Sequence, residues 1–444
     1  MKKEQWSSNI GFLLATAGSA IGLGNVWKFP YITGENGGGA FVLVYLVCIA
    51  CIGFPLMVCE FSLGRATRQG AVGAFRTFSR DRNTPLSMLL SGLLVLIGAL
   101  LLSFQYWGYG VLAVAAGIIL GVWGWKVVGA VVGVISPGLI ASYYCVIGGW
   151  TLIYFFKAIA GELNFQDPKV AEEVLAPIVS SDPSMMPAQI VAFFIFIVLT
   201  AVALLYGVRR GIERFSKILM PLLFLLLLLL VVRGMALPGA MEGVRFFLQP
   251  KLGNLHMESV LVALGHAFFT LSLAMGISIT YGSYMRKDQN VVKSALAVIG
   301  LDTMAAMMAG LAIFPALFAM GFAPDKGVGL AFMAVPAAFS KIPGGLGWLW
   351  NGAFFLALFI AALTSAISIL EALVNCCINE WKLSRRVAVL CSCVSTVLLG
   401  FLSLFSISNW DRLPWLKSLL VRCFGEANNS WMDLIDSFTS NWLL

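Results

Sequence analysis

Two segments of this sequence place glycines and small polar residues where long apolar runs would otherwise continue. Residues 18–30 read GSAIGLGNVWKFP, and residues 269–278 read FTLSLAMGIS. In hydrocarbon every backbone N–H and C=O must be paired, so such a break in a spanning helix persists only where it lines a site. Unwound backbone offers carbonyl oxygens to a dehydrated cation, and half-helix N-termini offer N–H groups to a carboxylate. A hard cation and a carboxylate-bearing molecule can therefore share one cavity here.

A third polar segment, residues 361–365 reading AALTS, puts two hydroxyl groups inside an otherwise apolar run. Hydroxyls in a helix more often bond to its own carbonyl groups, so this segment alone indicates little. Equivalent breaks in two halves of a chain are typical of inverted-repeat transporters, whose substrates and coupling ions lie between the unwound segments. Glycines used only for close helix packing are the alternative for either break taken alone.

The elements that must position these breaks are membrane-spanning helices. The chain has 444 residues, is 60% hydrophobic and only 11% charged, so its charged residues could not cover the exterior of a soluble core. Apolar stretches long enough to cross a bilayer, about 20 residues each, begin near residues 10, 40, 126, 187, 213, 259, 294, 346 and 386. We predict one transmembrane domain over residues 1–444, in contact with the lipid bilayer.

The net charge of +8 comes from short basic clusters between the apolar spans, which indicate topology and not a nucleic-acid partner. The clusters fall at alternate span ends, whereas residues 162–182 are mainly acidic. We expect a multi-pass protein of the plasma (inner) membrane with a cytoplasmic amino terminus. The opening imitates a secretory signal, but its apolar run continues past Ala20 into the glycines of the first break. Eight of the nine cysteines lie within apolar spans and are interpreted as packing residues.

The sequence resembles the bacterial amino-acid branch of the neurotransmitter:sodium symporter family. The resemblance is carried by the first break, ENGGGAF (35–41), RRGIERFSKILMP (209–221), FFTLSLAMG (268–276), TYGSYMRKDQN (280–290) and LTSAISILE (363–371). It extends from about residue 5 to residue 440. It implies an all-α polytopic membrane protein with an inverted five-plus-five helix repeat, in which the first and sixth helices are broken. Residues 10–236 would form the first repeat and residues 259–444 the second.

The resemblance implies two sodium sites and no organic cofactor. The first sodium ion would be held by the Ala20 carbonyl, Asn25, Thr270 and Asp302, with the substrate carboxylate as a further ligand. The second would be held by the carbonyl groups of Gly18, Ile21 and Ala361 and the hydroxyls of Thr364 and Ser365. All of these ligands are oxygens, as a hard cation requires.

The resemblance also implies where a substrate binds. Its carboxylate would meet the Tyr144 hydroxyl and N–H groups near Leu23 and Gly24, although Tyr144 could otherwise be a packing aromatic. The remaining lining would be Ser19, Ala20, Ile140, Phe269, Thr270, Ser272, Met275, Ser365, Ala366 and Ile369. Monoamine carriers of the family have an aspartate where this chain has Gly22. We therefore expect a neutral amino acid with a large hydrophobic side chain, because this lining is apolar and Met275 is adaptable.

Gates are implied at both ends of the site. Phe269 would cover the substrate, and Lys28 would face Asp436 in the outer vestibule. Lys28 stands where the family usually has arginine, so a bidentate ion pair is lost. Lys3 and Trp6 would close the cytoplasmic side. The family often has an aspartate where this chain has Asn379, so the partner at that gate stays open, with the neighbouring Glu380 as an alternative.

Asp302 is the most informative ionisable residue, because a carboxylate inside a spanning helix is costly unless it pairs with a cation or a proton. Chloride-dependent members use a glutamine and a serine where this chain has His266 and Ala306. We therefore expect Asp302 to supply the negative charge and transport to need no chloride. In a further hypothesis, Asp302 or His266 takes up a proton when sodium leaves, although a lone buried histidine is more often a packing residue.

Two segments depart from the family pattern. Residues 86–124 are an apolar insert, predicted to form an extra hairpin after the second helix for packing, lipid contact or a homodimer surface. Residues 433–444 resemble the start of a tenth helix but are too few to cross, so the second repeat is expected to be incomplete. A non-transporting amino-acid and sodium sensor, or an inactive truncated transporter, are therefore alternatives. An enzyme is disfavoured, because the chain has only two histidines and no metal-spaced cluster.

Overall fold

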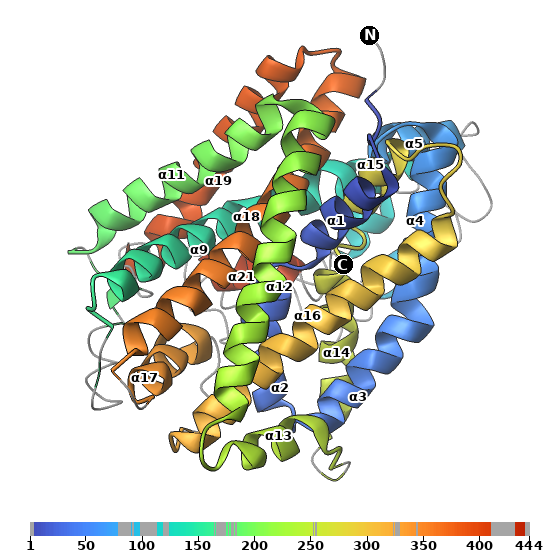
Figure 1. Cartoon of the computed structure of the whole chain (residues 1–444). Helices are drawn as coiled ribbons and strands as arrows, with labels where there is room; N and C mark the ends of the chain where they lie inside the picture. The colour runs from blue at the N-terminus through green and yellow to red at the C-terminus, as the bar shows by residue number, and fades with distance from the viewer. Residues whose placement is uncertain are drawn as a thin grey trace.

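The structure is a computed structural model of the chain, and its regular elements are helices throughout the described residues (Figure 1). It describes residues 4–78, 90, 93–97, 113–118, 124–163, 165, 175, 177–178, 182, 184–251, 253, 255–322, 324, 329–342, 345–409 and 431–439. The predicted apolar hairpin, residues 86–124, falls largely outside these ranges. So does the end of the predicted tenth helix after residue 439.

The first half of the chain begins with a broken span and continues through long apolar helices, in which π-helical segments are labelled η. In chain order the elements are α1 (Asn9–Ala20), η1 (Gly24–Lys28), α2 (Phe29–Glu35), α3 (Gly39–Cys48), η2 (Ile49–Gly53), α4 (Phe54–Thr67), α5 (Ala71–Phe78), α8 (Trp125–Ala130), η3 (Val131–Ile135), α9 (Ser136–Ile159), α11 (Met186–Leu205), η4 (Val208–Ile212), α12 (Glu213–Met235) and α13 (Ala240–Leu248). In four of them, α2, α4, α9 and α11, the second residue is a proline, and α2, α4 and α9 directly continue a π-helical segment.

The second half contains another broken span and the most buried helix. Its elements are α14 (Met257–Thr270), α15 (Ile277–Ser283), α16 (Val291–Ala319), η6 (Leu330–Ala334), α17 (Val335–Ser340), α18 (Gly347–Glu380), α19 (Arg385–Asn409) and α21 (Trp431–Phe438). In the apolar part of α18, 83% of the residues are buried, against 33% for the span Val208–Met235. α18 is therefore the centre of the bundle, and it packs closely against α9.

Seven helices within the described residues are long and apolar enough to cross a membrane, and the bent pair formed by α1 and η1–α2 would make an eighth. Their observed starts, at Asn9, Gly39, Trp125, Met186, Val208, Val291, Gly347 and Arg385, lie close to the predicted ones. Apolar side chains on α11, α12 and α19 are exposed on the outside of the bundle, as lipid contact requires. The chain is thus an integral membrane protein, as predicted.

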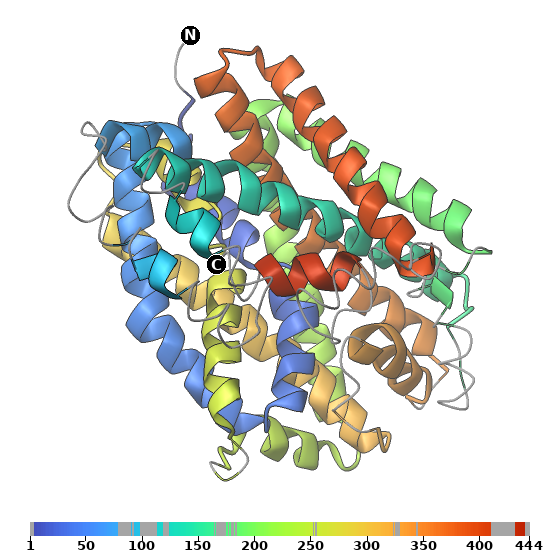
Figure 2. The ribbon, with the colours of Figure 1, turned by 180° about the vertical axis from the view of Figure 1, so that it is seen from behind.

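Two ends of the bundle matter for the site. The amino-terminal end carries the chain start, α5, α15 and the turn from α18 to α19, at the top of Figure 1. The opposite end carries α2, α13 and α17, at the bottom of the same view. Seen from behind, α21 lies against α9 and α19 in the middle of the molecule (Figure 2).

Candidate functional site

The first break lies between α1 and η1, at residues 21–23, where the span bends by 47°. Ile21 has an extended conformation (φ −74°, ψ 95°), which ends α1 and leaves carbonyl groups of its last turn without helical partners. The side-chain oxygen of Asn25 accepts a hydrogen bond from the Gly22 N–H at 3.1 Å. One freed donor is therefore satisfied locally, and carbonyl groups stay available to other partners.

The second break, residues 271–276, joins α14 to α15 through left-handed backbone. Ser272 has φ 52°, Ala274 has φ 58° and Gly276 has φ 67°. For a residue with a side chain this conformation costs about 1–3 kcal/mol, so surrounding structure must hold it in place. A carboxylate oxygen of Glu60, on α4, accepts the Ala274 N–H at 2.8 Å. Glu60 thus holds the second break from a helix far away in sequence.

Sequence reasoning missed Glu60, although a signal was present. Glu60 is a buried carboxylate within the apolar span Gly39–Thr67, and such residues mark functional sites in membranes. Its second oxygen has no hydrogen-bonding partner in the described part of the chain. One oxygen of the Glu60 carboxylate therefore binds the second break, and the other has no described hydrogen bond.

The two breaks touch each other. The Ser272 hydroxyl donates to the Ser19 carbonyl at 3.1 Å. A Cβ added at Gly24 would stand 3.1 Å from the Thr270 side chain and 3.2 Å from the Phe269 ring, so the close approach of η1 to α14 requires glycine. The polar parts of the first and sixth helices therefore form one continuous site.

The atoms predicted to hold the second sodium ion come together. The Ser365 hydroxyl lies 3.3 Å from the Gly18 carbonyl oxygen and 3.4 Å from that of Ile21. One residue earlier, the Thr364 hydroxyl donates to the Ala361 carbonyl at 3.2 Å. Oxygen atoms from α1 and α18 thus face each other across a buried contact, which is the ligand chemistry that a hard cation prefers.

The residues predicted to hold the first sodium ion come together in part. The Asn25 amide donates to the Asp302 carboxylate at 2.8 Å and to the Asp302 backbone carbonyl at 3.1 Å. Ala20 is the last residue of α1 and directly precedes the first break. The second Asp302 oxygen is buried without a described hydrogen-bonding partner. The Thr270 hydroxyl instead lies 3.3 Å from that of Tyr45. No described hydrogen bond joins Thr270 to Asn25 or Asp302.

The side chains predicted to line the substrate site are all buried between the breaks, α9 and α18. They are Ser19, Ala20, Leu23, Ile140, Tyr144, Phe269, Thr270, Ser272, Met275, Ser365, Ala366 and Ile369, and Gly24 is buried beside them. The Tyr144 hydroxyl accepts the Leu23 N–H at 2.9 Å. Sequence reasoning missed Ser368, whose hydroxyl accepts that of Ser19 at 2.7 Å one helical turn after Ser365.

His266 is buried among aromatic rings. Its ring stacks on Phe29 with centroids 5.7 Å apart and lies 5.4 Å from the ring of Tyr45. Neither imidazole nitrogen has a hydrogen-bonding partner among the described residues. The described contacts are therefore those of a packing residue, which was the alternative to a coupling role.

At the opposite end, the predicted gate residues meet. The Lys28 ammonium lies 2.7 and 2.8 Å from the two oxygens of Asp436, on α21. The same ammonium lies 4.7 Å from the centroid of the Phe269 ring, in the range of a cation–π contact. Lys28 thus ties η1 both to α21 and to the residue predicted to cover the substrate.

At the amino-terminal end, Trp6 is buried and Lys3 lies outside the described residues. The Trp6 indole N–H donates to the Tyr281 carbonyl at 3.2 Å, and its backbone N–H donates to the Tyr284 carbonyl at 3.3 Å. Its ring also packs edge-on against Tyr281 with centroids 5.2 Å apart. Trp6 therefore fastens the start of the chain to α15.

A buried carboxylate that sequence reasoning did not single out completes this end. Glu371, on α18, accepts the Arg385 guanidinium at 2.7 Å and the Tyr284 hydroxyl at 2.7 Å. The Asn375 amide donates to the same Tyr284 hydroxyl at 2.7 Å, and Arg385 also lies 3.3 Å from Glu4. One polar network thus joins α15, α18, α19 and the segment before α1. Glu371 was detectable as a charge inside an apolar run.

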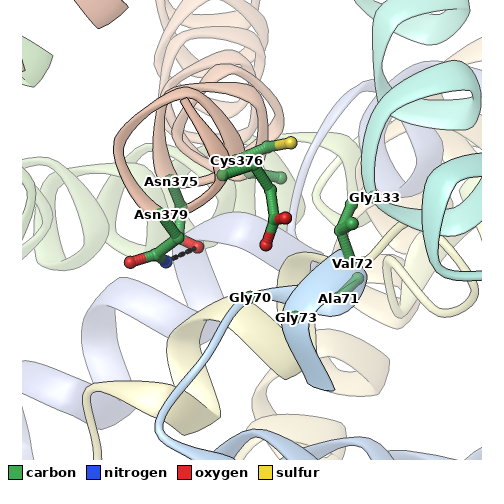
Figure 3. Close-up of a pocket in the computed structure, with 10 residues that line it drawn as sticks. Gly70, Ala71, Val72, Gly73, Gly133, Asn375, Cys376 and Asn379 are labelled. Atoms are coloured by element: carbon green, nitrogen blue, oxygen red, sulfur yellow. Dashed lines mark hydrogen bonds between the residues drawn. The ribbon is translucent and has the colours of Figure 1, made fainter. Parts of the chain in front are cut away.

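The role of Glu380 at the cytoplasmic gate stays a prediction, because Lys3, the basic residue expected at that gate, lies outside the described residues. Glu380 pairs with Arg76 of α5, at 2.5 and 3.1 Å, because α5 packs against the end of α18. Beside this ion pair a pocket of about 10 Å³, room for roughly one water molecule, separates α5 from Asn375, Cys376 and Asn379 (Figure 3). α5 therefore covers the carboxyl-terminal end of α18 with little free space between them.

Comparisons with known proteins agree with this geometry. The sodium:neurotransmitter symporter family matches residues 3–83 and 178–416. The uncharacterized sodium-dependent transporter YhdH of Bacillus subtilis is 40% identical over 373 residues, covering 84% of this chain and 72% of the relative. An uncharacterized sodium-dependent transporter of Methanocaldococcus jannaschii is 33% identical over 456 residues, covering 100% of this chain and 80% of the relative.

More distant and structural relatives point the same way. The sodium- and chloride-dependent GABA transporter 2 of Homo sapiens is 26% identical over 452 residues, covering 91% of this chain and 67% of the relative. The crystal structure of MhsT in complex with L-phenylalanine matches with a TM-score of 0.79 and 37% identity, covering 99% of this chain and 87% of MhsT. The chain therefore belongs to the sodium:neurotransmitter symporter family, and it is a sodium-dependent membrane transporter and not an enzyme.

Proposed function

We propose that this protein is a symporter that couples sodium entry to the uptake of a neutral amino acid with a large hydrophobic side chain, by alternating access. The observation that carries the proposal is the meeting of the two breaks. The Ser272 hydroxyl reaches the Ser19 carbonyl, and the Ser365 hydroxyl faces carbonyl groups of the first break. A cation and a substrate bound there would be shared by both halves of the chain, so neither could move alone.

Sodium would bind at two places in this site. Ser365, Thr364 and the carbonyl groups of Gly18, Ile21 and Ala361 would hold one ion, since these oxygens already converge. Asp302, Asn25, Thr270 and the Ala20 carbonyl would hold the other, together with the substrate carboxylate. The Thr270 hydroxyl would then leave Tyr45 and turn toward the ion. Because that carboxylate would be a ligand, sodium and substrate would stabilise each other's binding.

The substrate would be an amino acid with a hydrophobic side chain. A relative at 37% identity, MhsT, has been solved in complex with L-phenylalanine. In this chain the Tyr144 hydroxyl would turn from the Leu23 N–H to the substrate carboxylate. The side chain would lie among Ile140, Met275 and Ile369, which are buried and apolar. Small polar amino acids would leave this compartment unfilled.

Transport would not need chloride. Asp302 is fully buried, and one of its carboxylate oxygens lacks a described hydrogen-bonding partner. A charge held in that state is favourable only beside a cation, so Asp302 would balance sodium in place of a bound anion. Uptake should be unchanged when chloride is replaced by gluconate, and its collapse would contradict the proposal.

The orientation and internal repeat would follow the family pattern. The positions of the basic clusters between spans support an orientation in which the amino-terminal end, with Arg76, Arg209 and Arg385, is cytoplasmic and the Lys28–Asp436 end lies outside the inner membrane. Residues 10–236 and 259–444 would form the two inverted repeats. Uptake should then require sodium on the Lys28–Asp436 side.

The decisive experiment is uptake of radiolabelled L-phenylalanine into proteoliposomes that contain the full chain. Sodium, chloride and pH gradients should be varied separately, with unlabelled leucine, tryptophan, glycine and serine as competitors. We expect uptake only with an inward sodium gradient and competition by the hydrophobic amino acids. Competition by glycine or serine alone would overturn the substrate class. Sodium-dependent binding without uptake would instead indicate a non-transporting sensor.

The matched variant is Ser365→Ala, which removes a sodium-facing hydroxyl and leaves the helix intact. We expect the sodium concentration for half-maximal uptake to rise about tenfold, because one oxygen ligand of the ion is lost. Ser395→Ala removes a hydroxyl that bonds only to its own helix, at the Ser392 carbonyl, and serves as the control. Equal sodium dependence in the two variants would contradict the assignment.

A further inference from the structure

A groove separate from the transport site lies at the opposite end of the bundle. It has a volume of about 420 Å³, within the range of small-molecule sites. It is lined by Gly37, Glu242, Arg245, Phe246, Gln249, Lys251 and Phe318. None of these residues belongs to the breaks or to either gate.

The α13 helix builds most of this groove. Glu242, Arg245 and Gln249 are spaced by three and four residues, so they share one face of the helix. The other face is packed against α16, where a Cβ at Gly243 would stand 2.4 Å from the Phe314 carbonyl oxygen. This close approach prevents α13 from rolling, so the charged face is fixed toward the groove.

The charged side chains of the groove form no ion pair with another residue in the part of the chain that the structure describes. Arg245, Lys251 and Glu242 are exposed, and none of the three takes an ion pair in the described ranges. Two cations and one carboxylate therefore line the same space. A ligand with one anionic group and one ammonium group would pair with all three, whereas a simple anion would leave the Glu242 carboxylate without a partner.

Apolar surface continues from the charged face. Met241 and Leu248, seven residues apart, are 56% and 46% exposed and form the neighbouring stripe of α13. Inside the groove the Phe246 ring packs on Phe318 with centroids 5.2 Å apart. Because α13 connects two spanning segments, α12 and α14, this amphipathic helix lies at the membrane boundary. The ligand should therefore carry an apolar part beside its charges.

We propose that this groove binds the headgroup of a phospholipid that carries a phosphate and a primary ammonium group, as phosphatidylethanolamine does. Arg245 and Lys251 would bind the phosphate, which is a favoured partner of clustered basic side chains. Glu242 would accept the ammonium N–H groups. The acyl chains would lie along Met241 and Leu248. A free amino acid has the same two charges but no acyl chains, so the exposed stripe favours the lipid.

The test is native mass spectrometry of the full chain, released from membranes that contain equal amounts of phosphatidylethanolamine, phosphatidylglycerol and phosphatidylcholine. Phosphatidylcholine has the same charges but no ammonium N–H group. We expect phosphatidylethanolamine to be retained preferentially, and the double variant R245Q/K251Q to retain about tenfold less. Glu242→Gln should lose the preference over phosphatidylcholine while still retaining phospholipid. Lys341→Gln, which removes a cation at the same end outside the groove, is the control.

Three results would overturn the proposal. The double variant could retain as much phosphatidylethanolamine as the unmodified protein and the Lys341→Gln control. Phosphatidylglycerol could be preferred, which would mean that Glu242 has no part in recognition. Millimolar L-phenylalanine could displace the lipid, which would identify the groove as an amino-acid site. Circular dichroism of each variant should match the unmodified protein, and Arg245→Lys, which keeps the charge, should retain the lipid if the fold is intact.

Discussion

The two ends of the bundle are closed in different ways. At the opposite end one ammonium group, that of Lys28, joins η1 to α21 and to the Phe269 ring. At the amino-terminal end the carboxylate of Glu371 collects partners from α15 and α19, while Trp6 fastens the chain start. Among the described residues, one closure is centred on the Lys28–Asp436 ion pair, and the other is a network over several segments.

This difference indicates how the ends would open. The Lys28–Asp436 ion pair can separate by rotation of one side chain, and the strength of this pair depends on the groups directly around it. A network of buried hydrogen bonds is cooperative, so losing one member weakens the others. We infer that separating Lys28 from Asp436 acts mainly on the opposite end, whereas the amino-terminal end opens only when α15, α18, α19 and the chain start separate together.

The largest effect is expected for Glu371→Gln, which removes the buried charged partner of the Arg385 guanidinium and leaves it, among the described residues, only the longer ion pair with the Glu4 carboxylate at 3.3 Å. Removing one member of a buried pair costs about 3–5 kcal/mol, so the amino-terminal end should open. We expect uptake to fall more than tenfold and maleimide labelling of Cys376, which lines the adjacent pocket, to rise about tenfold. Labelling can be quantified by peptide mass spectrometry.

The control is Glu380→Gln, which breaks the ion pair with the half-exposed Arg76 beside the same pocket. Such a pair contributes about 0–1 kcal/mol, so labelling should change little. If both variants label Cys376 equally, the network is no stronger than a surface pair. The contrast between the two ends would then fail.

A somewhat smaller effect is expected for Trp6→Ala. The substitution removes a fully buried ring and its hydrogen bond to the Tyr281 carbonyl, which should cost about 3 kcal/mol. Cys376 labelling should rise, while the sodium dependence of phenylalanine binding stays unchanged. Trp6→Phe keeps the ring packing, so its rate of Cys376 labelling should lie between those of the unmodified protein and of Trp6→Ala. An unchanged labelling rate in Trp6→Ala would remove the chain start from the closure.

A moderate effect is expected for Lys28→Met, which keeps the apolar stem of lysine but removes its charge. The lost ion pair and cation–π contact should weaken the closure by about 1–2 kcal/mol. Bound radiolabelled L-phenylalanine should then dissociate about tenfold faster toward the opposite end. Labelling of Cys376 should not change, and a rise would show that the two ends are coupled more tightly than we infer.

The smallest effect is expected for Lys28→Arg. A guanidinium can bind both oxygens of Asp436 in a planar pair, which an ammonium cannot. We expect dissociation of L-phenylalanine to slow by about two- to threefold in a filter-binding assay. Faster dissociation would mean that the larger guanidinium does not fit beside Asp436. The shape of this site, more than its charge, would then select lysine.

Features with a local signal were predictable from the sequence. The broken first and sixth helices were expected from glycine-rich, polar segments in apolar runs, and the breaks were found there. The Lys28–Asp436 and Asn25–Asp302 contacts followed from the family resemblance. The left-handed conformation of Ser272 and Ala274 was not predictable, because that region is usually reserved for glycine.

What could not be predicted depends on distant partners. Glu60 accepts the Ala274 N–H although the two residues are 214 positions apart, and no sequence pattern near either residue predicts the contact. The ion pair of Glu380 with Arg76 was not predicted, because the packing of α5 on α18 has no local signature. Glu371 showed a charge in an apolar run, but its partner Arg385 lies beyond the end of the helix.

Arg385 also constrains the order in which the protein can assemble. It contacts Glu4, 381 positions earlier, and the Leu204 carbonyl at 2.7 Å. At about 5–20 residues per second of synthesis, the chain start would wait on the order of 20 to 75 seconds for this partner. During that interval Trp6 and the first broken helix must stay in the membrane without their final contacts. The amino-terminal end is therefore among the last parts to form, although it is the first to be made.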